Sequence, residues 1–140
     1  MLKNSKTFPE IYRAYSEECS VAGLPKPDEK LSAYAQLELY DLYWAYGAFD
    51  GEDVIGFIAT VTPIIPHYGV GITVAESLFV LPEYRPMGVG WKLITAAEKH
   101  AKEKGSAGIS LSSPAGGRLS EVLSKTDYRL TNEIYFKALQ

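Results

Sequence analysis

The chain has 140 residues, of which 46% are hydrophobic and 22% charged, and its 14 basic and 17 acidic side chains give a formal net charge of −3. This composition, without an apolar run of about 20 residues, excludes a disordered chain, a collagen, a coiled coil and a membrane-spanning helix. We therefore expect one domain over residues 1–140 in a soluble, cytoplasmic protein that needs no membrane partner.

The N-terminal part of the sequence predicts two helices. Thr7 is placed to cap the first helix, with Pro9 in its first turn and Gly23 as its end. Asp28 is placed to cap the second helix, which continues to about Tyr40 with apolar residues at helical spacing. Both helices should pack one face against a core.

The middle of the chain predicts three strands. The first two run from Trp44 to Phe49 and from Val54 to Thr62, and Asp50-Gly51 between them is a strong hairpin signal. After an irregular connection at residues 63–69, a third strand runs from Ile72 to Val80. This strand is apolar at most positions, but it carries one acidic residue, Glu76.

The C-terminal part opens with a predicted amphipathic helix from Trp91 to Lys104, which Gly105 ends. Four short elements are expected after it: a strand at Ile109–Leu111, a helix at Leu119–Leu123, and closing strands at Tyr128–Leu130 and Ile134–Ala138. The whole order predicts a mixed α/β (α+β) domain with one strand–helix–strand unit.

The stretch that joins the third strand to the long helix carries the chemistry. Gly88 and Gly90 lie directly before the N-terminus of the predicted helix, where unpaired N–H groups and the helix dipole form an anion site. Arg85 adds a cation. By itself, this Gly-x-Gly is explained equally well as a structural turn. It is neither a Walker loop nor a dinucleotide fingerprint, because no Gly-Lys-Ser/Thr and no third glycine follow.

With its flanking elements, this stretch resembles motif A of the GNAT N-acetyltransferase superfamily, Val-x-Pro-x-x-Arg-x-x-Gly-x-Gly. The matching residues are Val80, Pro82, Arg85, Gly88 and Gly90, and the order of elements is similar from about residue 5 to 138. The resemblance implies a GNAT-like, mostly antiparallel mixed sheet with flanking helices, in which the third strand splays from strand 109–111. In general appearance the chain is also similar to small phage-encoded members.

The resemblance implies acetyl-CoA as cosubstrate. No metal is expected, because two histidines cannot build a zinc site without carboxylates. The backbone of the strand end would bind the pantetheine arm, and the loop amides would cradle the pyrophosphate. The cofactor-binding residues expected on this basis are Leu78, Phe79, Val80, Arg85, Pro86, Met87, Gly88, Val89, Gly90 and Trp91.

Glu76 is the candidate catalytic residue, because a carboxylate on the strand that the acetyl group approaches can accept the proton of the attacking amine. A glutamate that faces solvent or forms a salt bridge is the alternative. The hydroxyl acid that many relatives offer to the leaving thiolate is not found, since Leu123 stands where its tyrosine is expected. Ser120, Ser124 or solvent would have to take that role.

We therefore predict an N-acetyltransferase that transfers an acetyl group to a primary amine by direct attack in a ternary complex. The alternative is a non-catalytic module that binds acyl-CoA or a protein through the same fold. Residues 1–84 hold 5 basic and 12 acidic side chains, whereas residues 85–140 hold 9 and 5. The balance of −7 in residues 1–84 suits a cationic amine acceptor, either a small molecule or a peptide. The balance of +4 in residues 85–140 suits an anionic cosubstrate. No nucleic-acid partner is expected, and relatives suggest a homodimer.

Overall fold

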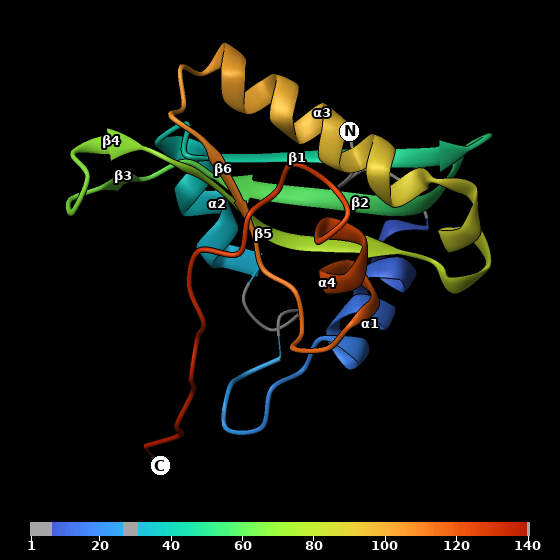
Figure 1. Ribbon diagram of the computed structural model, residues 1–140. Coiled ribbons are helices and arrows are strands. Elements are labelled where there is room, and N and C mark those ends of the chain that lie inside the picture. Colours follow the sequence, from blue (N-terminus) through green and yellow to red (C-terminus); the bar gives the residue numbers. More distant parts are fainter. Residues whose placement is uncertain (1–6, 27–30, 140) are drawn as a thin grey trace.

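The computed structural model describes residues 7–26 and 31–139, and Figure 1 shows how they are arranged. The elements in chain order are α1 (Phe8–Glu18), α2 (Leu31–Leu39), β1 (Tyr43–Asp50), β2 (Asp53–Val61), β3 (Ile64–Ile65), β4 (Val70–Gly71), β5 (Thr73–Val80), the 3₁₀ helix η3 (Pro82–Met87), α3 (Val89–Glu103), β6 (Ile109–Leu111) and α4 (Arg118–Leu123). The predicted succession is confirmed as far as α4. The proposed cap Asp28 lies outside the described residues.

The central sheet has four strands in the order β1-β2-β5-β6. β1, β2 and β5 pair antiparallel, and β5 pairs parallel with β6. The turn at Asp50-Gly51 joins β1 to β2 as predicted, with Gly51 at a φ of 62°, a value that favours glycine. The mixed, mostly antiparallel sheet predicted from the sequence is therefore confirmed.

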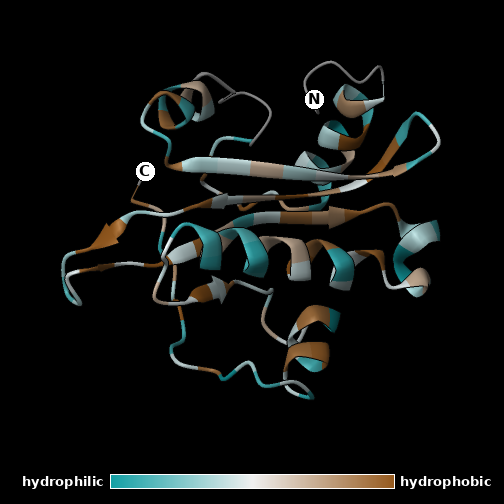
Figure 2. Cartoon of the chain, turned by 90° about the horizontal axis from the view of Figure 1, so that it is seen from above, coloured by the Kyte–Doolittle hydropathy of each residue, from teal (hydrophilic) through white to brown (hydrophobic). Residues whose placement is uncertain are grey.

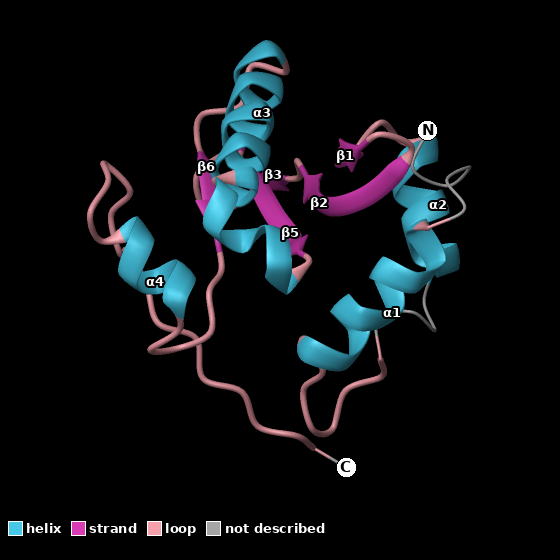
Figure 3. Cartoon of the chain, turned by 90° about the vertical axis from the view of Figure 1, so that its right-hand side faces the viewer, coloured by secondary structure: helices cyan, strands magenta, loops and turns pink. Residues whose placement is uncertain are grey.

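Helices cover both faces of this sheet (Figure 3). On one face α1 packs its aromatic residues around Phe57 and Phe79, and α2 lies beside β1. On the other face α3 buries Leu93, Ile94 and Ala97 against the sheet. The outward side of α3 is mostly hydrophilic in Figure 2, as an amphipathic surface helix requires.

The sheet opens into a fork between β5 and β6. Their pairing covers only Thr73 to Ala75 on β5, opposite Ile109 to Leu111. At the same level, β5 carries a bulge against β2, since Ala59 pairs with Ser77 and Thr60 with Ala75, which leaves Glu76 as the extra residue. A bulge bends its strand and redirects a side chain. The predicted splay of the two strands thus begins at Glu76.

Four local predictions differ from the structure. The first helix ends at Glu18, before the predicted end at Gly23. Thr7 does not cap α1 with its side chain; its hydroxyl accepts a hydrogen bond from the Val54 N–H at 2.8 Å and ties the helix start to β2. The connection at residues 63–69 includes part of a hairpin, β3–β4, whose two-residue strands are too short to show periodicity.

The closing strands expected at Tyr128–Leu130 and Ile134–Ala138 are wrong, because the chain after α4 is coil up to residue 139. Alternating apolar residues favour an extended conformation, but a strand also needs a neighbour that accepts its backbone hydrogen bonds. Among the described residues these segments have none.

Candidate functional site

The loop between β5 and α3 presents the start of a helix without a side-chain cap. η3 ends at Gly88, whose φ of 74° lies in the left-handed region, and α3 begins directly after it. The first N–H groups of an α-helix have no carbonyl partner within that helix, and they carry the positive end of its dipole. The loop therefore offers several N–H donors to an anion.

Gly90, the second residue of α3, is a glycine that the surrounding protein does not require. A Cβ at this position would lie 3.8 Å from Val80 Cγ2, which is an ordinary van der Waals contact. Glycine lowers helix stability by about 0.5–1 kcal/mol relative to alanine. A glycine at this position leaves the backbone N–H groups at the start of α3 open to close approach by an anion.

The end of β5 offers backbone atoms rather than side chains. Phe79 and Val80 are buried, on opposite faces of the sheet, and Leu78 is half-buried against α3. Beyond Ala75, no described strand pairs with β5 on the β6 side. This edge leads from Glu76 to the loop, and no described strand uses its backbone N–H and C=O groups on the β6 side.

Arg85 is held on the α1 side of the loop. Its Nε donates to the Val80 carbonyl at 2.8 Å, and its Nη2 donates to both carboxylate oxygens of Glu18, at 3.0 and 2.8 Å. The guanidinium also lies 5.4 Å from the centre of the Phe79 ring. The arginine therefore joins the loop, the end of β5 and the last turn of α1. Glu18 was not singled out from the sequence, because 67 positions separate it from Arg85.

Glu76 is exposed on the face of the sheet that α1 and α2 cover. Its Oε1 accepts a hydrogen bond of 3.0 Å from the hydroxyl of Tyr34, which comes from α2. The ring of Tyr34 lies 5.2 Å from that of Tyr43 on β1. Sequence reasoning did not foresee this partner, since tyrosines near the second helix are more often expected to fill the edge of a core than to contact a ligand.

The tyrosines around Glu76 stay protonated. Burial is the largest cause that raises the pKa of Tyr15, Tyr34 and Tyr43, and the carboxylate of Glu76 raises each further. Their hydroxyls are therefore neutral donors, and Glu76 supplies the negative charge of this group. A carboxylate among neutral hydroxyls suits the binding of a protonated amine and the acceptance of its proton.

Two of the C-terminal hydroxyls are engaged elsewhere. Tyr128 donates to Glu98 on α3 at 2.6 Å, and burial and this hydrogen bond raise its pKa. Ser124 donates to the Glu121 carbonyl within α4 at 2.7 Å. Ser120 and Leu123 both lie on α4. Among the described residues, no hydrogen bond or ion pair links these side chains to Glu76 or to the η3–α3 loop.

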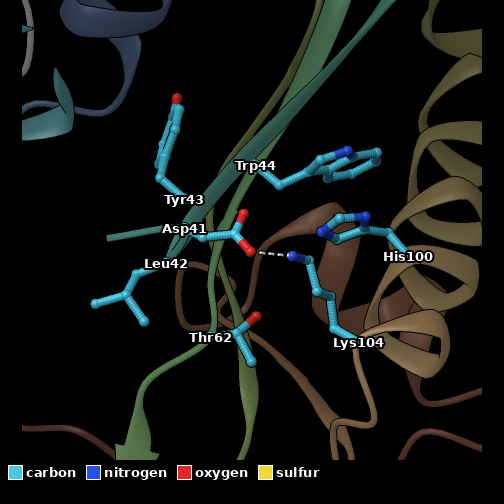
Figure 4. Close-up of a pocket in the computed structure, with 7 residues that line it drawn as sticks. All are labelled: Asp41, Leu42, Tyr43, Trp44, Thr62, His100 and Lys104. Carbon is cyan, nitrogen blue, oxygen red and sulfur yellow. Dashed lines mark hydrogen bonds and ion pairs between the residues drawn. The ribbon is translucent and has the colours of Figure 1, made fainter. Parts of the chain in front are cut away.

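A small cavity of about 170 Å³ lies at the opposite end of α3 (Figure 4). In it, Lys104 forms an ion pair with Asp41, and His100 stacks on Trp44 with ring centres 4.3 Å apart. Burial and the charge of Lys104 lower the pKa of His100. This cavity is separate from the fork and from the start of α3.

Residues 7–26 and 31–139 contain neither a candidate membrane span nor a candidate metal site. Within these ranges, no helix is long and apolar enough to cross a membrane. The same residues hold no group of three or more His, Cys, Asp or Glu side chains that could bind a metal ion.

A sequence model of the acetyltransferase (GNAT) family matches residues 8–115. Among solved structures, the chain is similar to AAC(6')-Iy in complex with the bisubstrate analogue CoA-S-monomethyl-acetylneamine, with a TM-score of 0.72 and 23% identity over 94% of this chain and 91% of that one. It is also similar to the ribosomal-protein-alanine N-acetyltransferase of Brucella melitensis biovar Abortus 2308, with a TM-score of 0.72 and 17% identity over 97% and 92%. A Trypanosoma brucei acetyltransferase has a TM-score of 0.71 and 16% identity over 99% and 95%.

A search of curated proteins found no match. At these identities, the similar structures show only that the fold is shared. The family model matches more than half of the chain, and it therefore shows which family the chain belongs to. The chain therefore belongs to the GNAT acetyltransferase family, and it is an acyltransferase.

Proposed function

We propose that this protein transfers an acetyl group from acetyl-CoA to a primary amine by direct attack in a ternary complex. The observation that carries the proposal is the fork, where the free edge of β5 connects Glu76 to the loop at the start of α3. Four residues of extended chain span about 13 Å. An elongated thioester with its phosphates at the loop would then present its acetyl end close to Glu76.

In this arrangement the loop residues bind and orient the phosphates. The residues proposed to do so, mainly through their backbone, are Arg85, Pro86, Met87, Gly88, Val89, Gly90 and Trp91. The backbone of Leu78, Phe79 and Val80 would bind the pantetheine arm. Because Arg85 is already paired with Glu18, we assign its side chain to holding the loop in place.

The reaction needs a neutral amine nitrogen. We propose that Glu76 accepts the proton of the ammonium group, directly or through water, while Tyr34 holds its carboxylate in place. The nitrogen then forms a bond to the thioester carbonyl carbon, and the bond from that carbon to sulfur breaks. The nitrogen loses its second proton to solvent as the amide forms. The leaving thiolate takes up a proton from solvent, since the hydroxyls of Ser124 and Tyr128 are engaged elsewhere.

The acceptor is proposed to be a cationic amine. Glu76 is a negative group among neutral tyrosines, and Glu38 adds a second charge near Tyr43. Two structures of AAC(6')-Iy, to which this chain is similar, support a small-molecule acceptor. One is described as an aminoglycoside N-acetyltransferase in complex with CoA, and the other is in complex with the bisubstrate analogue CoA-S-monomethyl-acetylneamine. If neutral or acidic amines are better acceptors than polycationic ones, and salt leaves the order unchanged, this part of the proposal fails.

The test measures release of free thiol from acetyl-CoA with a panel of amines. Glu76→Gln should lower kcat by about 10²–10⁴-fold, the usual contribution of a general base, and change the pH profile. Tyr34→Phe should have a smaller effect. Glu103→Gln, which changes an exposed glutamate at the far end of α3, is the matched control. Tight CoA binding without turnover on any amine would instead support the non-catalytic module.

A further inference from the structure

The cavity at the C-terminal end of α3 lies far from the fork. Its volume is about 170 Å³, and its walls come from the chain that leads into β1, from the residue after β2 and from the end of α3. α3 has 15 residues, so at a rise of about 1.5 Å per residue its two ends lie about 22 Å apart. An engineered cavity of about 150 Å³ holds a molecule of benzene. The cavity therefore has room for a small organic molecule that does not reach the proposed acetyl-transfer site.

Two opposite charges face each other in this cavity. The Lys104 ammonium group forms an ion pair with the Asp41 carboxylate, and Figure 4 shows the pair beside the rings of His100 and Trp44. These rings are stacked, with centres 4.3 Å apart. Burial and the charge of Lys104 lower the pKa of His100, so its ring is mostly neutral at pH 7. The cavity thus combines one cation, one anion and an aromatic wall.

The backbone position of Asp41 favours glycine. Its N–H donates to the Glu38 carbonyl at 3.0 Å. The next N–H, that of Leu42, donates to the Leu37 carbonyl at 3.0 Å, and together these hydrogen bonds close the C-terminus of α2. In this motif the residue at the Asp41 position has a positive φ, here 54°, and is usually glycine. A carboxylate is also unfavourable there, because the C-terminus of a helix carries a partial negative charge. Local structure therefore does not explain the aspartate.

The ion pair with Lys104 does not explain the aspartate either. The side chain of Asp41 is 81% exposed and that of Lys104 37%, and ion pairs at such exposure contribute little to stability. The pair therefore opens readily for a ligand that offers a partner to each charge. A molecule that carries an ammonium group close to a carboxylate does so, since it makes two charge-assisted contacts in place of one. The C-termini of α2 and α3, which lie next to Asp41 and Lys104 in the chain, favour its ammonium group.

We propose that this cavity binds a small α-amino acid as a zwitterion, with its carboxylate on Lys104 and its ammonium group on Asp41. The side chain of the amino acid lies against the rings of Trp44 and His100, and the volume of the cavity restricts it to a small one. This binding is independent of acetyl transfer, because none of the seven lining residues lies on β5 or in the loop at the start of α3.

The first experiment uses the two tryptophans of the chain, Trp44 in the cavity and Trp91 at the opposite end of α3. The full-length protein is isotope-labelled at its indole nitrogens, and Trp44→Phe assigns the two NMR signals. L-alanine, L-threonine and L-valine are the probes, and at least one should move the Trp44 signal along a saturable curve without moving that of Trp91. The N-acetyl derivative of this probe lacks the ammonium group and its methyl ester lacks the carboxylate, so both should bind at least tenfold more weakly. No movement with any probe, or equal binding of either derivative, overturns the proposal.

The second experiment removes the two charges one at a time. Asp41→Asn keeps a residue that tolerates a positive φ, and Lys104→Met keeps an unbranched side chain, so thermal unfolding should show that both variants are folded. Each substitution should raise the Kd of the probe that binds at least tenfold. Lys99→Met is the matched control, since it changes an exposed lysine of α3 that pairs with Glu103, and it should leave the Kd unchanged. A Trp44 signal that responds to the probe in both charge variants as it does in the natural chain overturns the proposal.

Discussion

Replacing Gly90 with alanine tests the proposed cofactor loop most directly, because it separates the folding of the loop from its binding. The new Cβ would meet Val80 Cγ2 at 3.8 Å, so no neighbour has to move. Alanine is the better helix residue by about 0.5–1 kcal/mol. The free energy of unfolding without ligand should therefore rise by up to that amount, and Tm by about 1–4 °C.

Binding should change in the opposite direction. The added methyl group stands where the backbone is proposed to meet a phosphate, and losing one hydrogen bond to a charged group costs about 1.5–3 kcal/mol. That corresponds to a Kd for CoA at least roughly tenfold higher. At a CoA concentration of about 100 times the original Kd, ligand stabilisation would fall from about 2.7 to about 1.4 kcal/mol.

Thermal unfolding with and without CoA measures both effects in one assay. Gly108→Ala is the matched control, since its Cβ would meet nothing within 4 Å and it lies beside β6, away from the loop; it should leave the CoA-induced shift unchanged. Gly88→Ala should lower Tm without ligand, because φ at this position is +74°. A Gly90→Ala protein that binds CoA as tightly as the natural chain would refute the assignment of the phosphates to the start of α3.

Three further outcomes are expected. Glu18→Gln should cost at most about 1 kcal/mol in urea unfolding, because its ion pair with Arg85 is partly exposed, yet it should raise the KM for acetyl-CoA more than it changes kcat. Phe57→Ala should lower the free energy of unfolding by about 3–5 kcal/mol in the same assay, since the side chain is only 2% exposed and contacts four other rings. Burial and Lys104 hold the pKa of His100 below its ordinary 6.5, so the folded state binds a proton less readily than the unfolded state; stability should fall as the pH drops below about 6.5, and His100→Gln should flatten this part of the pH curve.

Features that depend on neighbouring residues were determined by the sequence alone. The Asp50-Gly51 turn, the amphipathic α3 and the strand–loop–helix junction at Gly88 all lie where local patterns predicted them. The reason is that turn chemistry and helical periodicity act over a few residues. The motif from Val80 to Gly90 was sufficient to indicate the family for the same reason.

Features that depend on distant residues were decided by the tertiary structure. Tyr34 meets Glu76 across 42 positions and Arg85 meets Glu18 across 67, and no local pattern specifies such partners. The bulge that leaves Glu76 at the fork depends on the register between β2 and β5. The closing strands expected at residues 128–138 show the same limit. Alternation predicts that a segment can be a strand, whereas only a neighbour with free hydrogen-bonding groups makes it one.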